Sequence, residues 1–434
     1  MAPRELKKLS LRTVGCRLNQ YETEKMAADL MPYGFRRSEP GEEADLCIIN
    51  TCTVTHRADA DDRYLVKRAA REHPKAKVVV VGCYVDKDPD FVKGLERVDA
   101  VVLNRDKDRI AEILSERFPD LFADPPDHGC ATGVRFEQYN RAWVKVSDGC
   151  NQRCAFCILP SVRGELRNRA AGLIVDEINS LVADGFQEIA LTGLHLGLYR
   201  DRDLKSPIRN LAELCRLILR ETEIARIRLS SIEPQTVDDD LLKVYADANG
   251  RICRHLHMPL QSGSDGILKL MRRPYTREQY ITCAAAVRAV RPDTIIGADI
   301  IVGFPGETDE DFQASRRMAE MGLVDYWHIF SYSDRPGTRA SEYDHKVSPD
   351  VIKERRDILR IISEEWRRRA YRRQIGQTLN VIAERKPTNG HRFLGVADNY
   401  VRVQLPESYA GGRGIVPVLV TSAHDDYVAG DLLV

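Results

Sequence analysis

The sequence predicts an α/β protein in three parts: an N-terminal open parallel α/β sheet, a central partial (β/α)6 barrel and a small C-terminal antiparallel β-barrel. Short apolar strands alternate with helical stretches over residues 1–118 and again over 141–345, the pattern of parallel α/β architecture. Residues 374–434 change to short β-prone runs with glycine among the turns, which is typical of a small barrel. A linker containing proline and glycine is expected over 119–140, and a helical connector over 346–373.

The composition limits the classes of function. The 434 residues include 65 basic and 65 acidic side chains, so no overall charge favours nucleic acid. The N-terminal residues lack the apolar run of a signal peptide, and the longest apolar runs are only strand-sized. We therefore expect a cytoplasmic protein without a membrane partner. Eleven cysteines in such a chain predict metal ligands plus reduced thiols, with Cys130 in the linker as a free thiol.

Three cysteines follow strands of the first part, at Cys16, Cys52 and Cys83. Because the C-terminal ends of parallel strands share one edge of a sheet, these thiols are expected to converge despite their separation along the chain. The alternative is three ordinary small apolar residues, but their corresponding positions favour a set of ligands. Cys47 lies inside its strand and is predicted to be a core residue. The predicted strands are Leu9–Val14, Asp45–Asn50, Lys77–Val81 and Ala100–Leu103, and the helices are Asn19–Met31 and Ala58–Glu72.

Three more cysteines, Cys150, Cys154 and Cys157, lie close together just after a strand-like run. Thiolates this close can bind one iron–sulfur cluster, because thiolate is the usual protein ligand for such clusters. Three ligands on a four-iron cluster leave one iron open to bind a substrate. A structural zinc site is the alternative, but zinc takes four ligands and only Cys154 and Cys157 form a C-x2-C pair.

The second part contains six predicted strands, and several of them end in polar or glycine-rich sequences. A barrel places its chemistry at these strand ends, where glycine lets the backbone approach a ligand. A turn or helix cap is the alternative at each end, but four such ends together favour a ligand site. Asp299, inside the fifth strand, would point into the barrel toward a ligand or a neighbouring arginine. The predicted strands are Trp143–Val146, Glu188–Leu191, Arg226–Ser230, Leu256–Leu260, Ile295–Val302 and Trp327–Ser331.

Residues 349–373 form a long, charged helical stretch with repeated arginines. It is either a solvated helix that bridges two domains or a contact to RNA phosphates, which guanidinium groups suit. The strands predicted after it are Leu379–Ala383, Tyr400–Val403 and Pro417–Thr421.

These motifs together resemble the radical S-adenosylmethionine (SAM) methylthiotransferase family over essentially the whole chain. The cysteine loop is similar to the radical SAM signature, with the aromatic Phe156 before its last cysteine. The segment from Asn19 to Glu24 is most like the branch that modifies N6-threonylcarbamoyladenosine beside the tRNA anticodon, and residues 374–434 resemble a TRAM domain, an RNA-binding β-barrel. The matching segments are Gly15 to Glu24, Asn50 to Val54, Gly82-Cys83, Gly149 to Pro160, Arg163-Gly164, Met258 to Ser264, Met271 to Thr276, Asp299 to Thr308 and Phe330 to Thr338.

The resemblance implies two 4Fe–4S clusters and SAM, with no catalytic residue beyond the cluster ligands. The first cluster would be held by Cys150, Cys154 and Cys157 and would bind SAM; the second would be held by Cys16, Cys52 and Cys83 and would present sulfur. SAM contacts are then expected from Phe156, Thr192, Gly193, Ser231, Gln261, Asp299 and Gly303. The implied partners are tRNA, a one-electron donor such as flavodoxin or ferredoxin, and a sulfur source.

Other functions remain open from sequence alone. A methylthiotransferase of this kind could act instead on isopentenyladenosine in tRNA or on an aspartate of ribosomal protein S12. From another class, the chain could be a non-catalytic two-cluster electron-transfer protein or an RNA-binding protein. Ferredoxin-like carriers use four ligands per cluster, whereas each set here has three.

Overall fold

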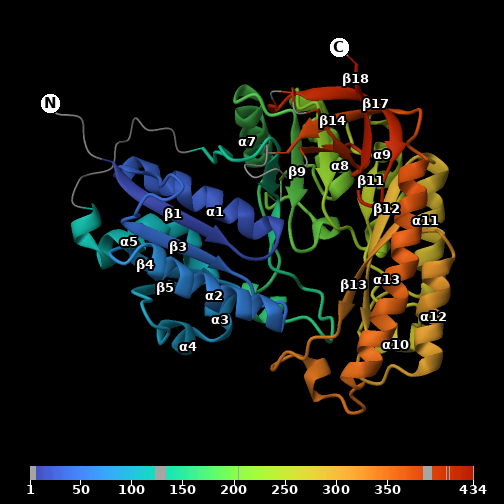
Figure 1. Ribbon diagram of the computed structural model, residues 1–434, viewed down its shortest axis with the longest axis horizontal. Helices are drawn as coiled ribbons and strands as arrows, with labels where there is room; N and C mark the ends of the chain where they lie inside the picture. Colours follow the sequence, from blue (N-terminus) through green and yellow to red (C-terminus); the bar gives the residue numbers. More distant parts are fainter. Residues whose placement is uncertain are drawn as a thin grey trace. The chain divides into compact units, whose positions relative to one another are not determined.

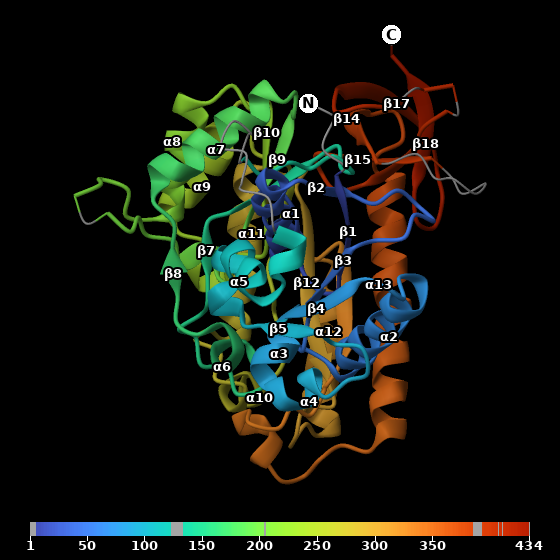
Figure 2. The ribbon, with the colours of Figure 1, turned by 90° about the vertical axis from the view of Figure 1, so that its left-hand side faces the viewer.

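The chain divides into two compact units, shown in Figures 1 and 2. Unit 1 contains Met1–Phe136, Asp148–Gln152 and Cys157–Leu166, and unit 2 contains Glu137–Ser147, Arg153–Phe156 and Arg167–Val434. The computed structural model describes residues 6–122, 133–203, 205–384, 393–406, 408–409 and 411–433. Part of the predicted linker, including Cys130, lies outside the described residues. The division into units passes through the cysteine loop, because Cys150 and Cys157 belong to unit 1 and Cys154 to unit 2.

Unit 1 is an open parallel sheet with helices on both faces, as the sequence predicts (Figure 1). The strand order is β2-β1-β3-β4-β5. Along β3 and β4 the side chains alternate between two cores, one shared with α1 and α5 and the other with α2 and α4. The elements are β1 (Lys7–Thr13), α1 (Arg17–Leu30), β2 (Phe35–Arg37), β3 (Leu46–Thr51), α2 (His56–Glu72), β4 (Lys77–Gly82), α3 (Cys83–Lys87), α4 (Pro89–Lys93), β5 (Ala100–Val102), α5 (Ile110–Arg117) and α6 (Leu159–Arg163).

Unit 2 begins with six parallel strands, in the orders β6-β9-β10 and β11-β12-β13. A bridge from Ile227 to Ile252 continues the arrangement from β10 toward β11. The predicted partial (β/α)6 barrel is therefore confirmed; α7, α8 and α9 can be followed in Figure 2. The elements are β6 (Ala142–Lys145), β7 (Ser147–Asp148), β8 (Arg167–Asn168), α7 (Ala171–Ala183), β9 (Glu188–Thr192), α8 (Leu211–Glu221), β10 (Arg226–Leu229), α9 (Asp239–Asp247), β11 (His255–His257), α10 (Asp265–Leu270), α11 (Arg277–Val290), β12 (Ile295–Val302), α12 (Asp309–Glu320) and β13 (Tyr326–Ser331).

The fourth barrel strand is shorter than predicted. β11 ends at His257, two residues before Pro259, which has no N–H to donate to a ladder. The chain rejoins the sheet through one bridge, from Gln261 to Ile300. Gln261 has a positive φ of 72°, so the backbone turns at the barrel mouth instead of continuing as a strand.

The last part of unit 2 is a closed five-stranded barrel, in the order β14-β15-β16-β18-β17. All its pairs are antiparallel except β16 with β18, which is parallel. The predicted strand at Tyr400 starts later, because Tyr400 adopts a turn with φ 70°. The elements are α13 (Pro349–Arg372), β14 (Thr378–Ala383), β15 (Leu394–Ala397), β16 (Arg402–Gln404), β17 (Ile415–Ala423) and β18 (Val428–Leu432).

Helix α13 packs against β13 of the partial (β/α)6 barrel and, through Ala370 and Tyr371, against the core of the C-terminal barrel. Most of its arginines pair with carboxylates. Arg355 contacts buried Glu307 at 2.6 Å, and Arg368 contacts Asp425 at 2.9 Å. These pairs favour the interpretation of α13 as a bridging helix over a contact to RNA phosphates. None of the helices in the described part of the chain is both long and apolar enough to span a membrane.

Candidate functional site

The ends of β1 and β4 present their cysteines through the same backbone turn. Gly15 and Gly82, which precede Cys16 and Cys83, both have φ of 106°, a conformation that favours glycine. Space requires glycine as well. A Cβ on Gly15 would lie 2.7 Å from Cys52 Cβ, and one on Gly82 would lie 2.6 Å from a backbone oxygen.

Cys16, Cys52 and Cys83, here called the strand-end cysteines, are free thiols near enough to interact with one another at the edge of the sheet. Burial, together with the neighbouring Cys83 and Cys16, raises the pKa of Cys52 to about 12. Dense surroundings also raise the pKa of Cys16, although its side chain reaches solvent; nearby Arg163 lowers it and Cys83 raises it. The structure thus brings together three thiols that lie far apart in sequence, and their binding of a cluster stays a prediction.

A buried arginine network surrounds the strand-end cysteines within unit 1, and sequence reasoning did not find it. Arg163 is only 3% exposed and donates from Nε to Cys83 Sγ at 3.2 Å. Its two other nitrogens donate to both carboxylate oxygens of Glu22, at 2.7 and 3.1 Å, and one of them to Asp148 at 3.2 Å. Lys107 donates to Glu22 at 2.7 Å. Two cations therefore face two carboxylates beside a thiol, inside the protein.

Asn19 connects this network to the backbone of the other two cysteines. Its Nδ2 donates to the Val14 carbonyl at 2.7 Å and to the Thr51 carbonyl at 2.9 Å. Those carbonyls lie just before Gly15-Cys16 and just before Cys52. Asn19 Oδ1 in turn accepts from Arg163. The positions of all three strand-end cysteines are thereby tied to one guanidinium group.

Cys150, Cys154 and Cys157, here called the loop cysteines, stay close because only a few residues separate them along the chain. In unit 1, Cys150 N donates to the Gly164 carbonyl at 3.1 Å, and Gln152 N donates to Cys150 Sγ at 3.4 Å. A Cβ on Gly149 would lie 1.9 Å from the Glu165 carbonyl oxygen, so glycine is required there.

In unit 2, Cys154 Sγ accepts a hydrogen bond from Arg273 Nη1 at 3.1 Å. Arg273 is buried, pairs with Glu233 and donates to the Tyr275 hydroxyl at 3.0 Å. Phe156 packs against an apolar cluster that includes Phe304. Sequence reasoning missed Arg273 too, although it lies in a segment that carries the family resemblance.

Thr192 and Gly193 lie where β9 ends, at the mouth of the barrel. Thr192 is buried, and a Cβ on Gly193 would lie 2.3 Å from Ser147 Oγ. Within the described residues the buried Ser147 hydroxyl has no hydrogen-bond partner. An unsatisfied hydroxyl beside a required glycine fits a place where a polar ligand group is bound.

Ser231 and Asp299 lie on either side of His257. Ser231 Oγ is 2.8 Å from His257 Nδ1, and Asp299 Oδ1 is 3.0 Å from His257 Nε2. Asp299 therefore faces a histidine, whereas the sequence suggested a ligand or an arginine. In the register of the sheet Asp299 stands beside His328, so polar groups line this level of the barrel. Gln261 completes the level, since its N–H donates to the Asp299 carbonyl at 2.9 Å.

Gly303 has a packing role. Its N–H donates to Glu307 at 2.7 Å, and a Cβ there would lie 2.3 Å from the Ile352 side chain. Glu307 is held in turn by Arg355 of α13 at 2.6 Å. The structure thus accounts for the glycine at this strand end by internal contacts, which is the turn interpretation.

In the described ranges of the chain, no three His, Cys, Asp or Glu side chains are grouped as the ligands of one metal ion. The thiolates of a cluster bind different irons and need not meet at one point. The donor chemistry fits an iron–sulfur cluster at each set of cysteines. Each set contains three thiols, and in each set one thiol accepts a hydrogen bond from a buried arginine.

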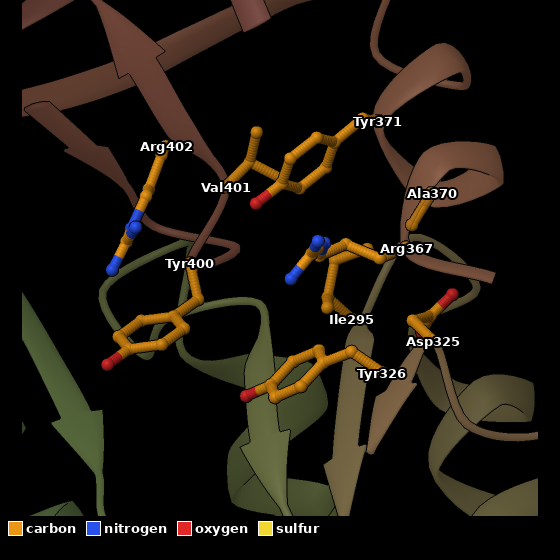
Figure 3. A pocket seen from close by; sticks show the side chains of 9 residues that line it. All are labelled: Ile295, Asp325, Tyr326, Arg367, Ala370, Tyr371, Tyr400, Val401 and Arg402. Carbon is orange, nitrogen blue, oxygen red and sulfur yellow. The ribbon is translucent and has the colours of Figure 1, made fainter. Parts of the chain in front are cut away.

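A small pocket lies elsewhere in unit 2, between α13 and the C-terminal barrel (Figure 3). Its volume is about 90 Å³, and Tyr326, Tyr371, Tyr400 and Arg367 contribute to its lining. Not one predicted site residue contributes to it, and its lining is mainly apolar. We therefore treat the strand-end cysteines of unit 1, the loop cysteines and the barrel mouth of unit 2 each as a candidate site.

Comparisons with known proteins concern the family of the chain. Residues 144–319 match the Radical SAM superfamily, and residues 8–103 match a family described as uncharacterized protein family UPF0004. The chain is 34% identical, over 91% of its length and 90% of the relative, to the threonylcarbamoyladenosine tRNA methylthiotransferase MtaB of Chlamydia pneumoniae. It is also 34% identical, over 98% of its length and 95% of the relative, to the tRNA-2-methylthio-N(6)-dimethylallyladenosine synthase of Syntrophobacter fumaroxidans.

Among solved structures, the radical SAM methyltransferase TsrM of Kitasatospora setae shares the fold. The TM-score is 0.58 at 16% identity, and the match covers 77% of each chain. At that identity the likeness concerns the fold alone.

Proposed function

The chain belongs to the radical SAM methylthiotransferase family, and we propose that it adds a methylthio group to carbon 2 of N6-threonylcarbamoyladenosine beside the tRNA anticodon. The observation that carries the proposal is the convergence of the strand-end cysteines in a chain that also contains the C-x3-C-x2-C loop. The relative named for threonylcarbamoyladenosine, similar over nine-tenths of the chain, supports the choice of nucleoside.

The cofactors of the proposal are SAM and two 4Fe–4S clusters. The loop cysteines would hold the cluster that binds SAM, and the strand-end cysteines would hold the second. When bound, these groups supply the radical chemistry that replaces the hydrogen on carbon 2 with a methylated sulfur. The electron comes from a one-electron donor such as flavodoxin or ferredoxin, and the sulfur from a separate source.

The chain's own residues position these groups. Arg163 and Arg273 each direct an N–H at one cysteine sulfur, which fixes that side chain. Phe156 provides an apolar wall near the loop cysteines. Ser231, His257 and the neighbouring Asp299 offer hydrogen-bonding groups at the barrel mouth, where a polar part of SAM would bind.

We propose the domain roles from the same argument. Residues 1–118 form the domain of the second cluster, 141–345 the SAM barrel, 346–373 a connector and 374–434 a TRAM-like domain for tRNA. A cytoplasmic location suits a tRNA partner. Helix α13 contributes structure to this arrangement, since its arginines are largely engaged with carboxylates.

The choice among nucleosides needs its own experiment. The segment from Asn19 to Glu24, which suggested the branch, is mostly buried. It contacts the backbone just before two of the strand-end cysteines rather than solvent. Relatives named for two different nucleosides also share the same 34% identity with this chain. Buried residues of this kind discriminate branches only indirectly.

The test begins with anaerobic reconstitution of the protein with iron and sulfide. The protein then reacts with tRNA whose modified adenosine lacks the methylthio group at carbon 2, and mass spectrometry of the nucleosides measures the product. Two tRNAs are compared, one with N6-threonylcarbamoyladenosine and one with isopentenyladenosine, together with ribosomal protein S12. We expect methylthiolation of the first alone. Product only on the second or on S12 would replace the proposed substrate. If the protein takes up iron but neither cleaves SAM nor forms product, a non-catalytic cluster protein is favoured.

A further inference from the structure

Arg163 lies in a segment that carries the family resemblance, but neither the resemblance nor the proposed function assigns it a role. It is the buried cation whose N–H points at Cys83 Sγ, 3.2 Å away. It comes from α6, six residues after Cys157, and reaches the end of β4 within unit 1. A buried guanidinium is expensive to desolvate and is kept only where several partners hold it.

The partners of Arg163 fix it in one orientation. Glu22 binds it through two nitrogens, and Asn19 binds the outer one. Asp148 adds a contact at 3.2 Å. Planar two-point pairing of this kind orients a guanidinium group, so its remaining donor, Nε, can point only at the thiol.

Charge completes the argument. Glu22 and Asp148 offset Arg163 and Lys107, so the network is balanced before any group binds. Asn104 adds a second donor to Cys83, with Nδ2 at 3.5 Å from the sulfur. A sulfur that receives N–H donors and faces a fixed cation is stabilised when it carries more negative charge.

We propose that Arg163 is a positioning residue that raises the reduction potential of the cluster held by the strand-end cysteines. Reduction adds one electron, which comes from the external donor, and no bond forms or breaks at the arginine. Its hydrogen bond to Cys83 stabilises the reduced, more negative form, and Glu22 holds it in place. The inference rests on the proposed second cluster.

The experiment uses the full-length chain with C150A, C154A and C157A, so that only the strand-end site can bind a cluster. Anaerobic reconstitution and iron analysis come first. If this protein takes up no cluster, the proposed second cluster fails. If it does, an EPR-monitored redox titration gives the midpoint potential, and the inference on Arg163 is tested separately.

Arg163→Gln in that background is expected to shift the midpoint potential to a more negative value. The loss of one charge-assisted hydrogen bond corresponds to about a tenfold change in the reduction equilibrium, or about 59 mV for one electron. Arg37→Gln is the matched control, since Arg37 pairs with buried Glu24 on the same helix as Glu22. Among the described residues Arg37 donates no hydrogen bond to a cysteine. Its potential should equal that of the parent.

Each remaining outcome decides the inference. An unchanged potential at full iron content in Arg163→Gln overturns it. Loss of iron from a variant whose apo form keeps the parent's melting temperature supports a positioning role. If the single variant does not fold, R163Q with E22Q removes one cation and one anion together and keeps the charges balanced. A parent-like potential in that double variant, or failure to fold in both, assigns Arg163 to the ion pair alone and overturns the proposal.

Discussion

The two sets of cysteines are presented in opposite ways. The strand-end cysteines come from three neighbouring strands, so tertiary structure brings them together. The loop cysteines come from one short stretch, so the covalent chain alone keeps them close. A set of the first kind depends on the stability of the whole sheet, whereas a set of the second kind depends on one loop and the groups that hold it.

The arginines beside the two sets differ in the same sense. Arg163 is balanced by two carboxylates and lies near a second cation, Lys107. Arg273 has Glu233 as its one carboxylate partner in the described contacts and donates also to the Tyr275 hydroxyl. The strand-end cysteines thus depend on a larger charged network than the loop cysteines do. Four predictions test how far this difference extends.

Cys52→Ala gives the largest expected effect, because it removes one of the strand-end cysteines and none of the loop cysteines. Methylthiolated nucleoside should fall below detection, while reductive cleavage of SAM to 5′-deoxyadenosine continues. Mass spectrometry of both products measures this. The matched control is Cys47→Ala, in the core of strand β3, which ends directly before Cys52; this variant should retain the product. Equal loss of both activities in C52A would contradict separate roles for the two sets.

Glu22→Gln should destabilise unit 1 strongly, because it leaves Arg163 and Lys107 with one carboxylate fewer inside the protein. Removal of one partner from a buried ion pair costs about 3–5 kcal/mol. Urea unfolding of the apo protein, followed by circular dichroism, measures the loss. Glu112→Gln, which breaks an exposed pair with Arg109 in the same unit, should change the unfolding midpoint little. Similar midpoints for the two variants would show that the network is not under strong charge constraint.

Gly15→Ala should reduce both stability and iron uptake. A residue forced into a positive φ costs on the order of 1–3 kcal/mol, and the added Cβ would also press on Cys52. Gly376→Ala is the control, because Gly376 has φ of 81° with nothing within 4 Å of the added atom. We expect a smaller stability loss there and full iron content. Full iron content in G15A would mean that the turn does not set the position of the thiols.

The last prediction concerns the pH dependence of a buried network without any cysteine ligand, around Glu188 in unit 2. Burial would raise the pKa of Glu188, but the charges of Arg228, Arg226 and Arg141 outweigh it and hold that pKa well below its ordinary value of 4.5. Because the folded pKa is the lower one, this stabilisation is complete above pH 4.5 and is lost as the pH falls toward the folded pKa. The free energy of unfolding should decrease below pH 4.5 by at most about 1.4 kcal/mol per pH unit from this group.

Chemical denaturation at several pH values measures the slope, with Glu188→Gln as the comparison. That variant should be less stable at pH 7 and should depend less on pH below 4.5. An identical slope in the two proteins would show that other carboxylates account for the acid sensitivity.

The sequence predicts the fold class well because strand and helix periods alternate cleanly in both α/β parts. Elements fail where single residues override the pattern. β11 stops short of Pro259, and β16 starts after the turn at Tyr400. The strands β15 and β18 were not predicted because each is short and contains a glycine, which weakens the pattern of a strand.

The cysteines could be predicted because their position relative to strands, or their spacing, is visible in the chain. The contacts of the arginines could not, since Arg163 and Glu22 are 141 residues apart, although both lie in segments that carry the family resemblance. One signal was present: several polar residues between Asn19 and Glu24 lie in a helix that must pack on a sheet. Such residues are buried only when they have partners, so that segment indicated a polar network before the partners were known.

The paired glycine turns after β1 and β4 have a consequence for comparing relatives. Each thiol is located by the last residue of its strand, so the stretches that connect one strand to the next can lengthen or shorten without displacing it. Chains that differ widely in the intervals between these three cysteines can therefore share one geometry. A search for this arrangement should look for three strand ends that carry a cysteine, two of them directly after a glycine, and should ignore the distances between them.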